Sequence, residues 1–390
     1  MARASHNAPA MPSISTEATV LELARAAGFD LAGIAPLRPP RDAERFERWL
    51  DQGRHAGLDY LERNRERILD PRRLLPSGRS ILVVGLSHAR SAVHLEGGGR
   101  VARYAAGRDY HNVIGRMLRK LHRRLVEEGL VPAGSRARRG VDAIPLLERS
   151  HAAEAGLGFL SKAANLLHPR FGPWFFLAEL LLERDLEPTG SPPAGSCGTC
   201  RACIDACPTA AIVEPGLVDA GRCISYHTIE SREPIPRELR ASVGPWAFGC
   251  DVCSEVCPWG RDAGDSSARF GSHRAVEGGL VRWLEPRDEA EWSRWLEGSP
   301  LKRPGRAGLA RNAAIVLGQN PSEEGRGALL RALSFDPSSV VREAAAWGLA
   351  RGHGAERGSA EALERAAARE GDPAARAEIL RSLEERPRGS

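Results

Sequence analysis

The 390-residue chain has no apolar run long enough to cross a membrane. Its best apolar run, Trp174–Leu182, is nine residues long and is interrupted by Glu179, whereas a membrane-spanning helix needs about 20 apolar residues. The first 16 residues also lack an apolar signal core and a twin arginine. We therefore expect a disordered leader at residues 1–15 and a cytoplasmic protein.

Familiar nucleotide-binding motifs are missing as well. No G-x-G-x-x-G sequence follows a predicted strand, so a nicotinamide or flavin site of the Rossmann type is not indicated. No Walker loop occurs either. An electron-accepting cofactor in this chain would have no familiar short motif.

Lysine is scarce relative to arginine, and the net charge is only +5. Basic residues gather at 63–73, 116–124 and 136–139. These runs are compatible with an arginine-rich, solvated surface, but guanidinium groups also suit phosphate, so a phosphate-binding face is the alternative. Charge alone does not decide between the two.

Cysteine is absent outside residues 197–257, where all eight cysteines lie. The first four follow the spacing C-x2-C-x2-C-x3-C-P from Cys197 to Pro208. This is the spacing of bacterial ferredoxins, in which three cysteines bind one 4Fe–4S cluster and the fourth binds a second cluster. The second run, residues 250–258, lacks a leading cysteine, and the upstream Cys223 can fill that vacancy.

We therefore expect two 4Fe–4S clusters with crossed ligands. One cluster is assigned Cys197, Cys200, Cys203 and Cys257, and the other is assigned Cys207, Cys223, Cys250 and Cys253. Disulfides are an alternative that a cytoplasmic chain disfavours, and zinc rarely uses C-x2-C-x2-C-x3-C-P. Two adjacent clusters would form an electron path that must end on a reducible group.

The segment before the cysteines has the pattern of a mixed α/β domain. Residues 16–27 are expected to form a helix that ends at Gly28, and residues 80–86 a short buried strand. A second helix is expected over 113–125, because its apolar residues fall on one face and Gly129 follows.

Five motifs in this chain, in one order, resemble those of a known family. They are RYAAGRDYH at 103–111, VDAIPLLER at 141–149, AGLGF at 155–159, RCISYHTIE at 222–230 and FGCDVC at 248–253, with CPW at 257–259. The chain resembles epoxyqueuosine reductases, which complete queuosine synthesis in tRNA. The resemblance implies cobalamin beside two 4Fe–4S clusters, and reduction of an epoxide on the wobble base to an alkene.

The resemblance also implies roles for single residues. Asp142 stands at the position of the proton donor, and an acid is needed because an alkoxide is a poor leaving group. We expect burial beside an apolar corrin to raise its pKa. The positions that contact cobalamin or the adjoining tRNA are Arg63, Ser225, Arg232 and Asp251, together with Leu166 and Leu177, which would also pass as core leucines.

A polar and aromatic cluster could also reach the substrate base or the cofactor. Its members are Tyr104, Asp109, Tyr110 and His111, although a buried tyrosine or histidine usually satisfies a core hydrogen bond. The loop 159–165 departs from the family pattern, because Ser161 replaces a glycine and Ala163 a polar residue, while Lys162 is retained. His227 stands where the family mostly has an apolar residue.

The C-terminal part has internal repeats. Arg311, Arg342 and Arg376 begin similar blocks at offsets of 31 and 34 residues, joined by turns rich in Asp, Pro and Ser. This pattern indicates HEAT-like helical pairs. A partner-binding scaffold is the common use of such repeats. We favour tRNA binding, with Arg311 and Arg342 on one edge meeting phosphates.

Together these features predict a mixed α+β protein. We expect a nitroreductase-like, cobalamin-binding α/β domain at 16–186, a ferredoxin-like domain with two clusters at 187–285 and HEAT-like repeats at 286–390. The expected partners are tRNA and an external electron donor, and the protein is expected to be a monomer. The rivals are a reductive dehalogenase-like cobalamin enzyme, which would commonly carry a twin-arginine signal, and an iron–sulfur electron-transfer protein.

Overall fold

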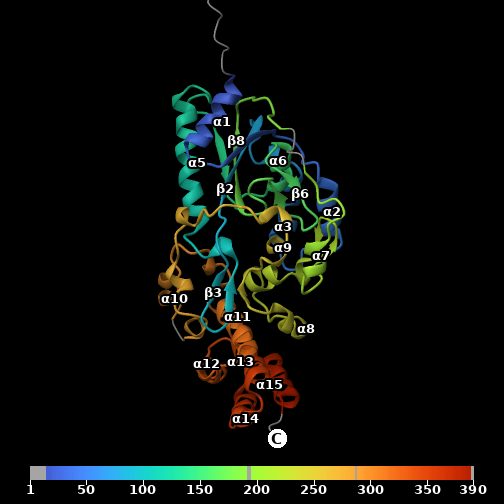
Figure 1. Ribbon diagram of the computed structural model, residues 1–390, viewed down its shortest axis with the longest axis vertical. Helices are drawn as coiled ribbons and strands as arrows, with labels where there is room; N and C mark the ends of the chain where they lie inside the picture. Colours follow the sequence, from blue (N-terminus) through green and yellow to red (C-terminus); the bar gives the residue numbers. More distant parts are fainter. Residues whose placement is uncertain (1–14, 191–194, 286–287, 388–390) are drawn as a thin grey trace, which may run out of the picture.

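A computed structural model describes residues 15–190, 195–285 and 288–387, so the expected leader at 1–15 lies almost wholly outside the described residues. The molecule is elongated (Figure 1), with an α/β sheet at one end and a stack of C-terminal helices at the other. The cysteine-rich segment lies between the two, on one side of the long axis.

A four-stranded sheet forms the centre of the α/β part. The strands follow the order β1-β2-β8-β5, and each neighbouring pair is antiparallel. Their bounds are β1 Leu31–Pro36, β2 Ser80–Ser87, β8 Phe175–Leu182 and β5 Ala137–Gly140. Every residue of β2 is buried, so the predicted buried strand at 80–86 is confirmed.

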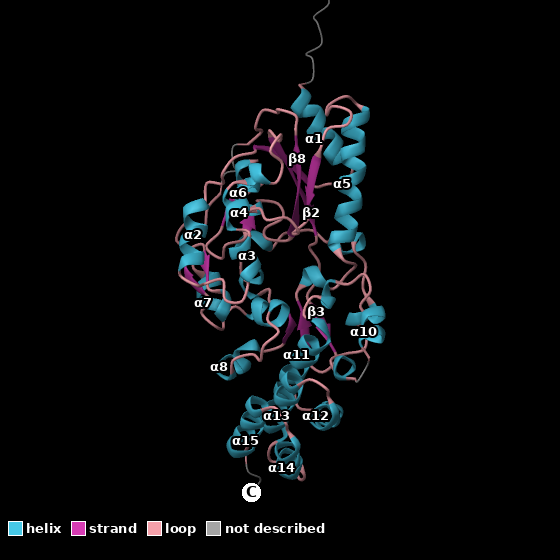
Figure 2. Cartoon of the chain, turned by 180° about the vertical axis from the view of Figure 1, so that it is seen from behind, coloured by secondary structure: helices cyan, strands magenta, loops and turns pink. Residues whose placement is uncertain are grey.

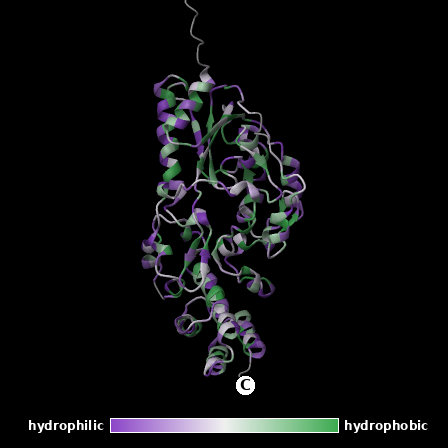
Figure 3. Cartoon of the chain, viewed as in Figure 1, coloured by the Kyte–Doolittle hydropathy of each residue, from purple (hydrophilic) through white to green (hydrophobic). Residues whose placement is uncertain are grey.

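Side-chain alternation along the strands assigns each residue to one face of the sheet. Leu82, Leu180 and Leu182 pack with α1 (Thr16–Ala26) and α5 (Tyr110–Glu127). The opposite face carries Ile81 and Leu181, which pack with α6 (Glu148–Glu154). Figure 3 shows the mostly hydrophobic strands between helices that have hydrophilic outer turns.

Both predicted helices of this part are confirmed. α1 ends before Gly28, which has a φ of +98°, and α5 ends before Gly129, with a φ of +69°. A residue in this left-handed region is best supplied by glycine, so each glycine fixes a helix end. The N-terminus of α5 is capped by Asp109, whose carboxylate accepts a hydrogen bond from the His111 backbone.

Two groups of shorter elements complete the front of the chain, one beside the sheet and one in the cysteine-rich segment (Figure 2). Beside the sheet lie α2 Ala43–Asp51, α3 Asp59–Arg63, α4 Arg65–Leu69, β6 Phe159–Leu160 and β7 Leu166–Leu167. The cysteine-rich segment has α7 Ala202–Ala206, β9 Ile212–Glu214, β10 Leu217–Val218, α8 Arg237–Arg240 and α9 Val252–Glu255. It is joined to the front of the chain by β11 Trp246–Phe248, which pairs with the hairpin of β3 Val93–Leu95 and β4 Gly99–Val101.

The predicted C-terminal repeats are present as stacked helices. After α10 (Glu289–Trp295) come α11 Gly305–Gln319, α12 Glu323–Phe335, α13 Ser339–His353, α14 Ser359–Arg369 and α15 Pro373–Glu385. The turn at 336–338 separates α12 from α13, and the Asp372 carboxylate caps α15. Small residues allow close contact between α11 and α13, where a Cβ on Gly318 would lie 2.3 Å from the Cα of Gly348.

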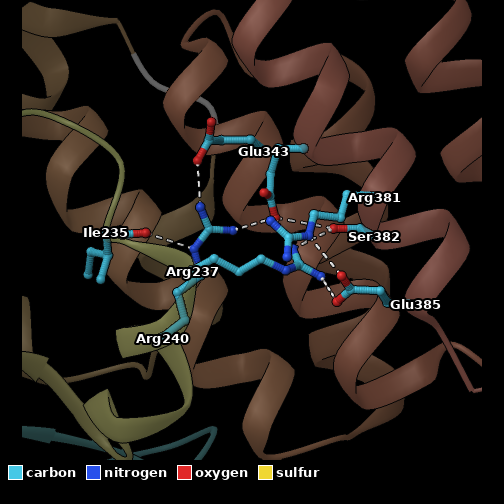
Figure 4. A network of polar contacts seen from close by, with 8 residues as sticks. Ile235, Arg237, Arg240, Glu343, Arg381, Ser382 and Glu385 are labelled. Atoms are coloured by element: carbon cyan, nitrogen blue, oxygen red, sulfur yellow. Dashed lines mark hydrogen bonds and ion pairs between the residues drawn. The ribbon is translucent and has the colours of Figure 1, made fainter. Parts of the chain in front are cut away.

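Charged contacts dock the repeats on the cysteine-rich segment (Figure 4). Arg240 of α8 lies 2.8 Å from Glu343 of α13 and 2.8 Å from Glu378 of α15. Arg237 pairs with Glu385 at 2.6 Å. Because Arg240 and Glu343 are both buried, losing Arg240 would leave the Glu343 carboxylate as an uncompensated buried charge. The helices are therefore held against the rest of the chain.

The expectation that Arg311 and Arg342 meet phosphates is wrong. The Arg311 side chain is fully buried and donates to the backbone carbonyls of Ser231, Glu233 and His227. Arg342 makes a two-point contact with Glu370, at 2.6 and 2.7 Å. Both guanidinium groups bind partners within the protein. The partners lie in other segments of the chain, which the repeat pattern in the sequence does not reveal.

Replacing Arg311 with Met is expected to lower the free energy of unfolding by about 3 kcal/mol or more, because three backbone carbonyls, two of them in buried contacts, lose a charged donor. Urea unfolding measures this change. The matched control is Arg376→Met at the equivalent position of α15, where the arginine is exposed and the change should stay within about 0.5 kcal/mol. Equal effects of the two substitutions would contradict a structural role for Arg311.

Candidate functional site

The eight cysteines are free thiols on α7, α9 and the adjoining loops, and α7 packs against α9. Burial raises the pKa of Cys257, and so do the neighbouring thiols of Cys197 and Cys200. Burial, Cys197 and Cys257 do the same for Cys203. The same four cysteines line one pocket, together with Cys253, so they lie close enough to one another to form one set.

A second set contains the other four cysteines. Burial raises the pKa of Cys250, with further contributions from Cys253 and Cys223. Burial also raises the pKa of Cys223, and the thiol of Cys207 adds to that shift. Each set has four thiols, the number that a 4Fe–4S cluster needs. The residues thus fit two clusters in chemistry and in grouping. Which thiolate binds which cluster stays a prediction.

The loop that departs from the family pattern lies against the first set. Lys162 donates through Nζ to the carbonyls of Gly198 and Cys200, at 2.7 and 2.9 Å. Its backbone N–H points at Cys197 Sγ, 3.4 Å away. The Ser161 hydroxyl accepts from the Asn165 N–H at 3.1 Å, so the serine closes the turn between β6 and β7.

Asp142 follows β5 and stands in an exposed loop with a φ of +51°. This left-handed backbone is unfavourable for a residue other than glycine, and such strain is typical of functional sites. The Tyr110 hydroxyl donates to Oδ2 of Asp142 at 2.8 Å and orients the carboxylate. Because the side chain is exposed, a group bound over this loop would bury it.

Aromatic side chains line the site beside Asp142. Tyr110 stacks on Phe176 with 4.2 Å between ring centroids, and Tyr104 meets both rings edge-on. Burial raises the pKa of Tyr104, with further contributions from Asp142 and Asp251. The two aspartates, 109 positions apart in the chain, are therefore neighbours across one tyrosine.

Asp251 directly follows Cys250 and is buried. Its Oδ2 accepts from the Arg103 backbone N–H at 2.7 Å. Burial raises its pKa to about 6. Asp251 thus connects the second cysteine set with the aromatic wall that contains Tyr104.

The remaining predicted site residues have different settings. Leu166 is buried and Leu177 partly buried in one apolar cluster on the α6 face of the sheet. Ser225 is partly buried two residues after Cys223, and Arg63 and Arg232 are exposed. An aromatic and apolar wall with a few polar groups is the usual lining of a cofactor site, so the residues fit a large, mostly apolar ring.

Two other polar residues that the sequence singled out, Asp109 of the polar cluster and His227, have structural roles. Asp109 caps α5 and lies 2.8 Å from Nδ1 of His111. His227 is buried, and its Nε2 lies 2.8 Å from the Gly221 carbonyl. Burial lowers the pKa of His227. Of the four cluster residues, Tyr110 is the one that contacts Asp142.

Two carboxyl groups of the site were not predicted. Glu148 accepts from the Asp142 backbone N–H at 3.0 Å, and Glu179 lies fully buried in β8 behind it. Each had a signal in the sequence. Glu148 belongs to the VDAIPLLER motif, and Glu179 is the one charge in the best apolar run.

Over the described residues, no helix is both long enough and apolar enough to span a membrane.

Three family models match parts of the chain. Residues 196–260 match a 4Fe-4S double cluster binding domain, and residues 69–143 match the family described as "Epoxyqueuosine reductase QueG, DUF1730". Residues 303–384 match HEAT repeats. The first match supports the iron–sulfur interpretation over zinc, and the third supports the repeat architecture.

Solved structures have the same fold. A crystal structure of epoxyqueuosine reductase with an epoxyqueuosine-modified tRNA stem loop superposes with a TM-score of 0.84 at 28% identity, covering 94% of this chain and 97% of that one. The epoxyqueuosine reductase of Streptococcus thermophilus gives a TM-score of 0.83 at 21% identity, covering 94% and 98%. The expected fold, with an α/β domain, a double-cluster module and helical repeats, is confirmed.

Curated relatives agree over most of the sequence. The epoxyqueuosine reductase of Xanthomonas campestris is 38% identical over 349 residues, covering 86% of this chain and 96% of the relative. That of Pseudomonas aeruginosa is 37% identical over 347 residues, covering 86% and 94%. With this identity over this length, the chain belongs to the epoxyqueuosine reductase family.

Proposed function

We propose that this chain reduces epoxyqueuosine to queuosine in tRNA, with electrons that pass through two 4Fe–4S clusters. The observation that carries the proposal is the setting of Asp142, which lies exposed at the aromatic wall that Asp251, the residue after Cys250, also reaches. Family membership supports the same activity, because the relatives are epoxyqueuosine reductases.

The reaction sets the requirements of the site. Removing the epoxide oxygen to leave an alkene consumes two electrons and two protons, and releases water. The electrons come from an external donor through the clusters. Asp142 supplies a proton to the departing oxygen, and the Tyr110 hydroxyl holds its carboxyl group toward the aromatic wall.

Cobalamin is the cofactor that we propose beside this wall. When bound, it supplies a cobalt centre that accepts electrons singly and reacts with carbon electrophiles. Its large ring would lie against the aromatic side chains and would exclude water from Asp142. The residues proposed to hold it are Arg63, Leu166, Leu177, Ser225, Arg232 and Asp251.

The tRNA is proposed to bind over the exposed face beside Asp142. The hydrogen bond to Glu230, with an N–O distance of 2.9 Å, raises the pKa of the exposed Arg303, and so does the charge of Asp142, so Arg303 lies near Asp142. The exposed Arg232 donates to the Arg303 carbonyl. Lys302 lies next to this group and 3.7 Å from Asp109. Contacts of such cations with phosphates would make binding weaken with salt.

We also propose the division into domains at 16–186, 187–285 and 286–390, a monomeric state and a cytoplasmic location.

Expression in a strain without its own epoxyqueuosine reductase tests this function. The tRNA of that strain contains epoxyqueuosine, and the chain should convert it to queuosine when cobalamin is available in the medium. Nucleoside analysis by mass spectrometry measures the two forms. Persistent epoxyqueuosine, with the protein present and its clusters assembled, would contradict the proposal.

A further inference from the structure

A buried carboxyl group lies behind the exposed acid of the site. Glu179 stands in β8 between the register partners Val83 and Gly140, and its relative exposure is 0%. Its odd position along the strand puts it on the same face as Leu181, toward α6. A Cβ on Gly140 would lie 3.0 Å from Oε2 of Glu179, so the carboxyl group points toward the end of β5, where Asp142 follows.

The side chain beside the Glu179 carboxyl group is another carboxylic acid, and not a basic group. Within residues 15–190, 195–285 and 288–387, no hydrogen-bond donor reaches either of its carboxyl oxygens, and no lysine or arginine forms an ion pair with it. The group that it meets is the carboxyl group of Glu148, at the first turn of α6. Two carboxyl groups can bond to each other only when at least one of them carries a proton.

The charges around the pair favour the protonated form. Glu148 is partly exposed as a residue, but burial of its carboxyl group raises its pKa to about 8, and the charge of Asp142 adds to this shift. Burial and the charge of Glu148 raise the pKa of Glu179 as well. Arg149 is the cation that opposes these effects on Glu148. The other titratable groups that sense Glu148 are the tyrosines Tyr60 and Tyr110.

Glu148 also connects the pair with the exposed acid. Its Oε1 accepts from the backbone N–H of Asp142 at 3.0 Å, which fixes the loop against the start of α6. The Tyr110 hydroxyl holds the Asp142 side chain from the other direction, at 2.8 Å. Glu148 therefore lies between Glu179, in the sheet interior, and the loop that carries Asp142.

The proposed reaction needs two protons in each turnover, and one aspartic acid holds one. We propose that Glu148 and Glu179 share a stored proton, and that Glu148 passes it to Asp142 after Asp142 has protonated the departing oxygen. The O–H bond of Glu148 breaks as that of Asp142 forms, the pair gains one negative charge, and solvent later returns the proton. Glu148 and Glu179 are positioning residues, because they act through Asp142. This inference rests on the proposed function.

The sign of the pH dependence follows from the raised pKa. Below about pH 8 the pair keeps its proton and can supply it. As the pH rises through that value, the pair loses the proton and turnover falls. Because the two carboxyl groups are coupled, the alkaline limb near pH 8 belongs to the pair and not to Glu148 alone.

The test is Glu148→Gln in the cobalamin-loaded enzyme with both clusters. The glutamine amide oxygen can still accept from the Asp142 N–H, so the loop keeps its hydrogen bond, but no proton can be released. We expect kcat to fall at least about tenfold at pH 7 with KM for tRNA unchanged, and the alkaline limb near pH 8 to disappear. Glu148→Asp, which retains a carboxyl group, should recover part of the rate.

Infrared spectroscopy of the resting protein gives a second readout that does not depend on activity. Between pH 7 and pH 9 the wild type should lose a C=O band of a protonated carboxyl group, and Glu148→Gln should not show this loss. The matched control is Glu154→Gln, on the same helix, where the buried carboxylate pairs with Arg38. It should retain both the alkaline limb and the infrared change.

Two results would overturn the inference. One is a Glu148→Gln enzyme with wild-type kcat and an unchanged limb near pH 8. The other is an infrared titration that is the same with and without Glu148. If the wild type itself fails to reduce epoxyqueuosine, then the proposed function is wrong, and the infrared result still decides whether the pair stores a proton.

Discussion

Replacing Asp142 with Asn is expected to lower turnover by about 10²–10⁴-fold, the usual contribution of a general acid. The amide has the same size and can still accept from the Tyr110 hydroxyl, which bonds to the carboxylate at 2.8 Å in the native protein. It cannot give a proton to an alkoxide. The loss should therefore appear in kcat, while iron content and cobalamin binding stay at native levels.

The matched control for this substitution is Asp185→Asn. Asp185 is also an exposed aspartate. It follows the C-terminal end of β8, whereas Phe176 of the aromatic wall lies at the N-terminal end of that strand. Its replacement should leave turnover unchanged. Turnover of Asp142→Asn within about twofold of the wild type would refute the assignment of Asp142 as the acid.

The second large effect is expected from Cys223→Ala. A cluster held by three thiolates is incomplete, so bound iron should fall from about eight to about four per chain. Turnover should be lost, because one step of the electron path is missing. Iron analysis and electron paramagnetic resonance of the reduced protein measure the loss, and the remaining signal should be that of one cluster.

Cys223 is the informative cysteine because it lies outside both regular runs. Its assignment to the second cluster rests on the missing position before Cys250 and on its proximity to Cys250 and Cys253. Cys257→Ala is the contrasting variant and should remove the other cluster. Full iron in Cys223→Ala would show that a different group completes the second cluster.

Local patterns predicted the elements of the α/β part well. The helix at 113–125 and the strand at 80–86 could be predicted because each has a strong apolar periodicity and a glycine or polar boundary. The repeats could be predicted for the same reason, since small residues recur at helical spacing. In these segments local propensity and tertiary packing favour the same structure.

Long-range charge contacts could not be predicted in this way. Arg311 and Arg342 occupy equivalent positions in the repeat, which suggested one common role at the surface. Their real partners, the carbonyls near residue 231 and the carboxylate of Glu370, lie elsewhere in the sequence. A repeat pattern shows that positions are equivalent within the repeat, but it carries no information on what the rest of the chain packs against them.

The candidate site shows the same limit. Asp142 was identified by the motif that contains it, whereas Glu179 was noticed only as a charge within an apolar run. Its meaning depends on strand register and on the start of α6, which bring Glu148 and Gly140 to it. A single buried carboxyl group in a sequence gives no sign of its partner.

The most direct test of the account uses the purified chain with both clusters and cobalamin, a chemical reductant and tRNA that carries epoxyqueuosine. Mass spectrometry of the nucleosides should show queuosine, with one oxygen atom fewer, and no conversion when cobalamin is left out. Unchanged epoxyqueuosine with all cofactors bound, or equal conversion without cobalamin, would contradict the account.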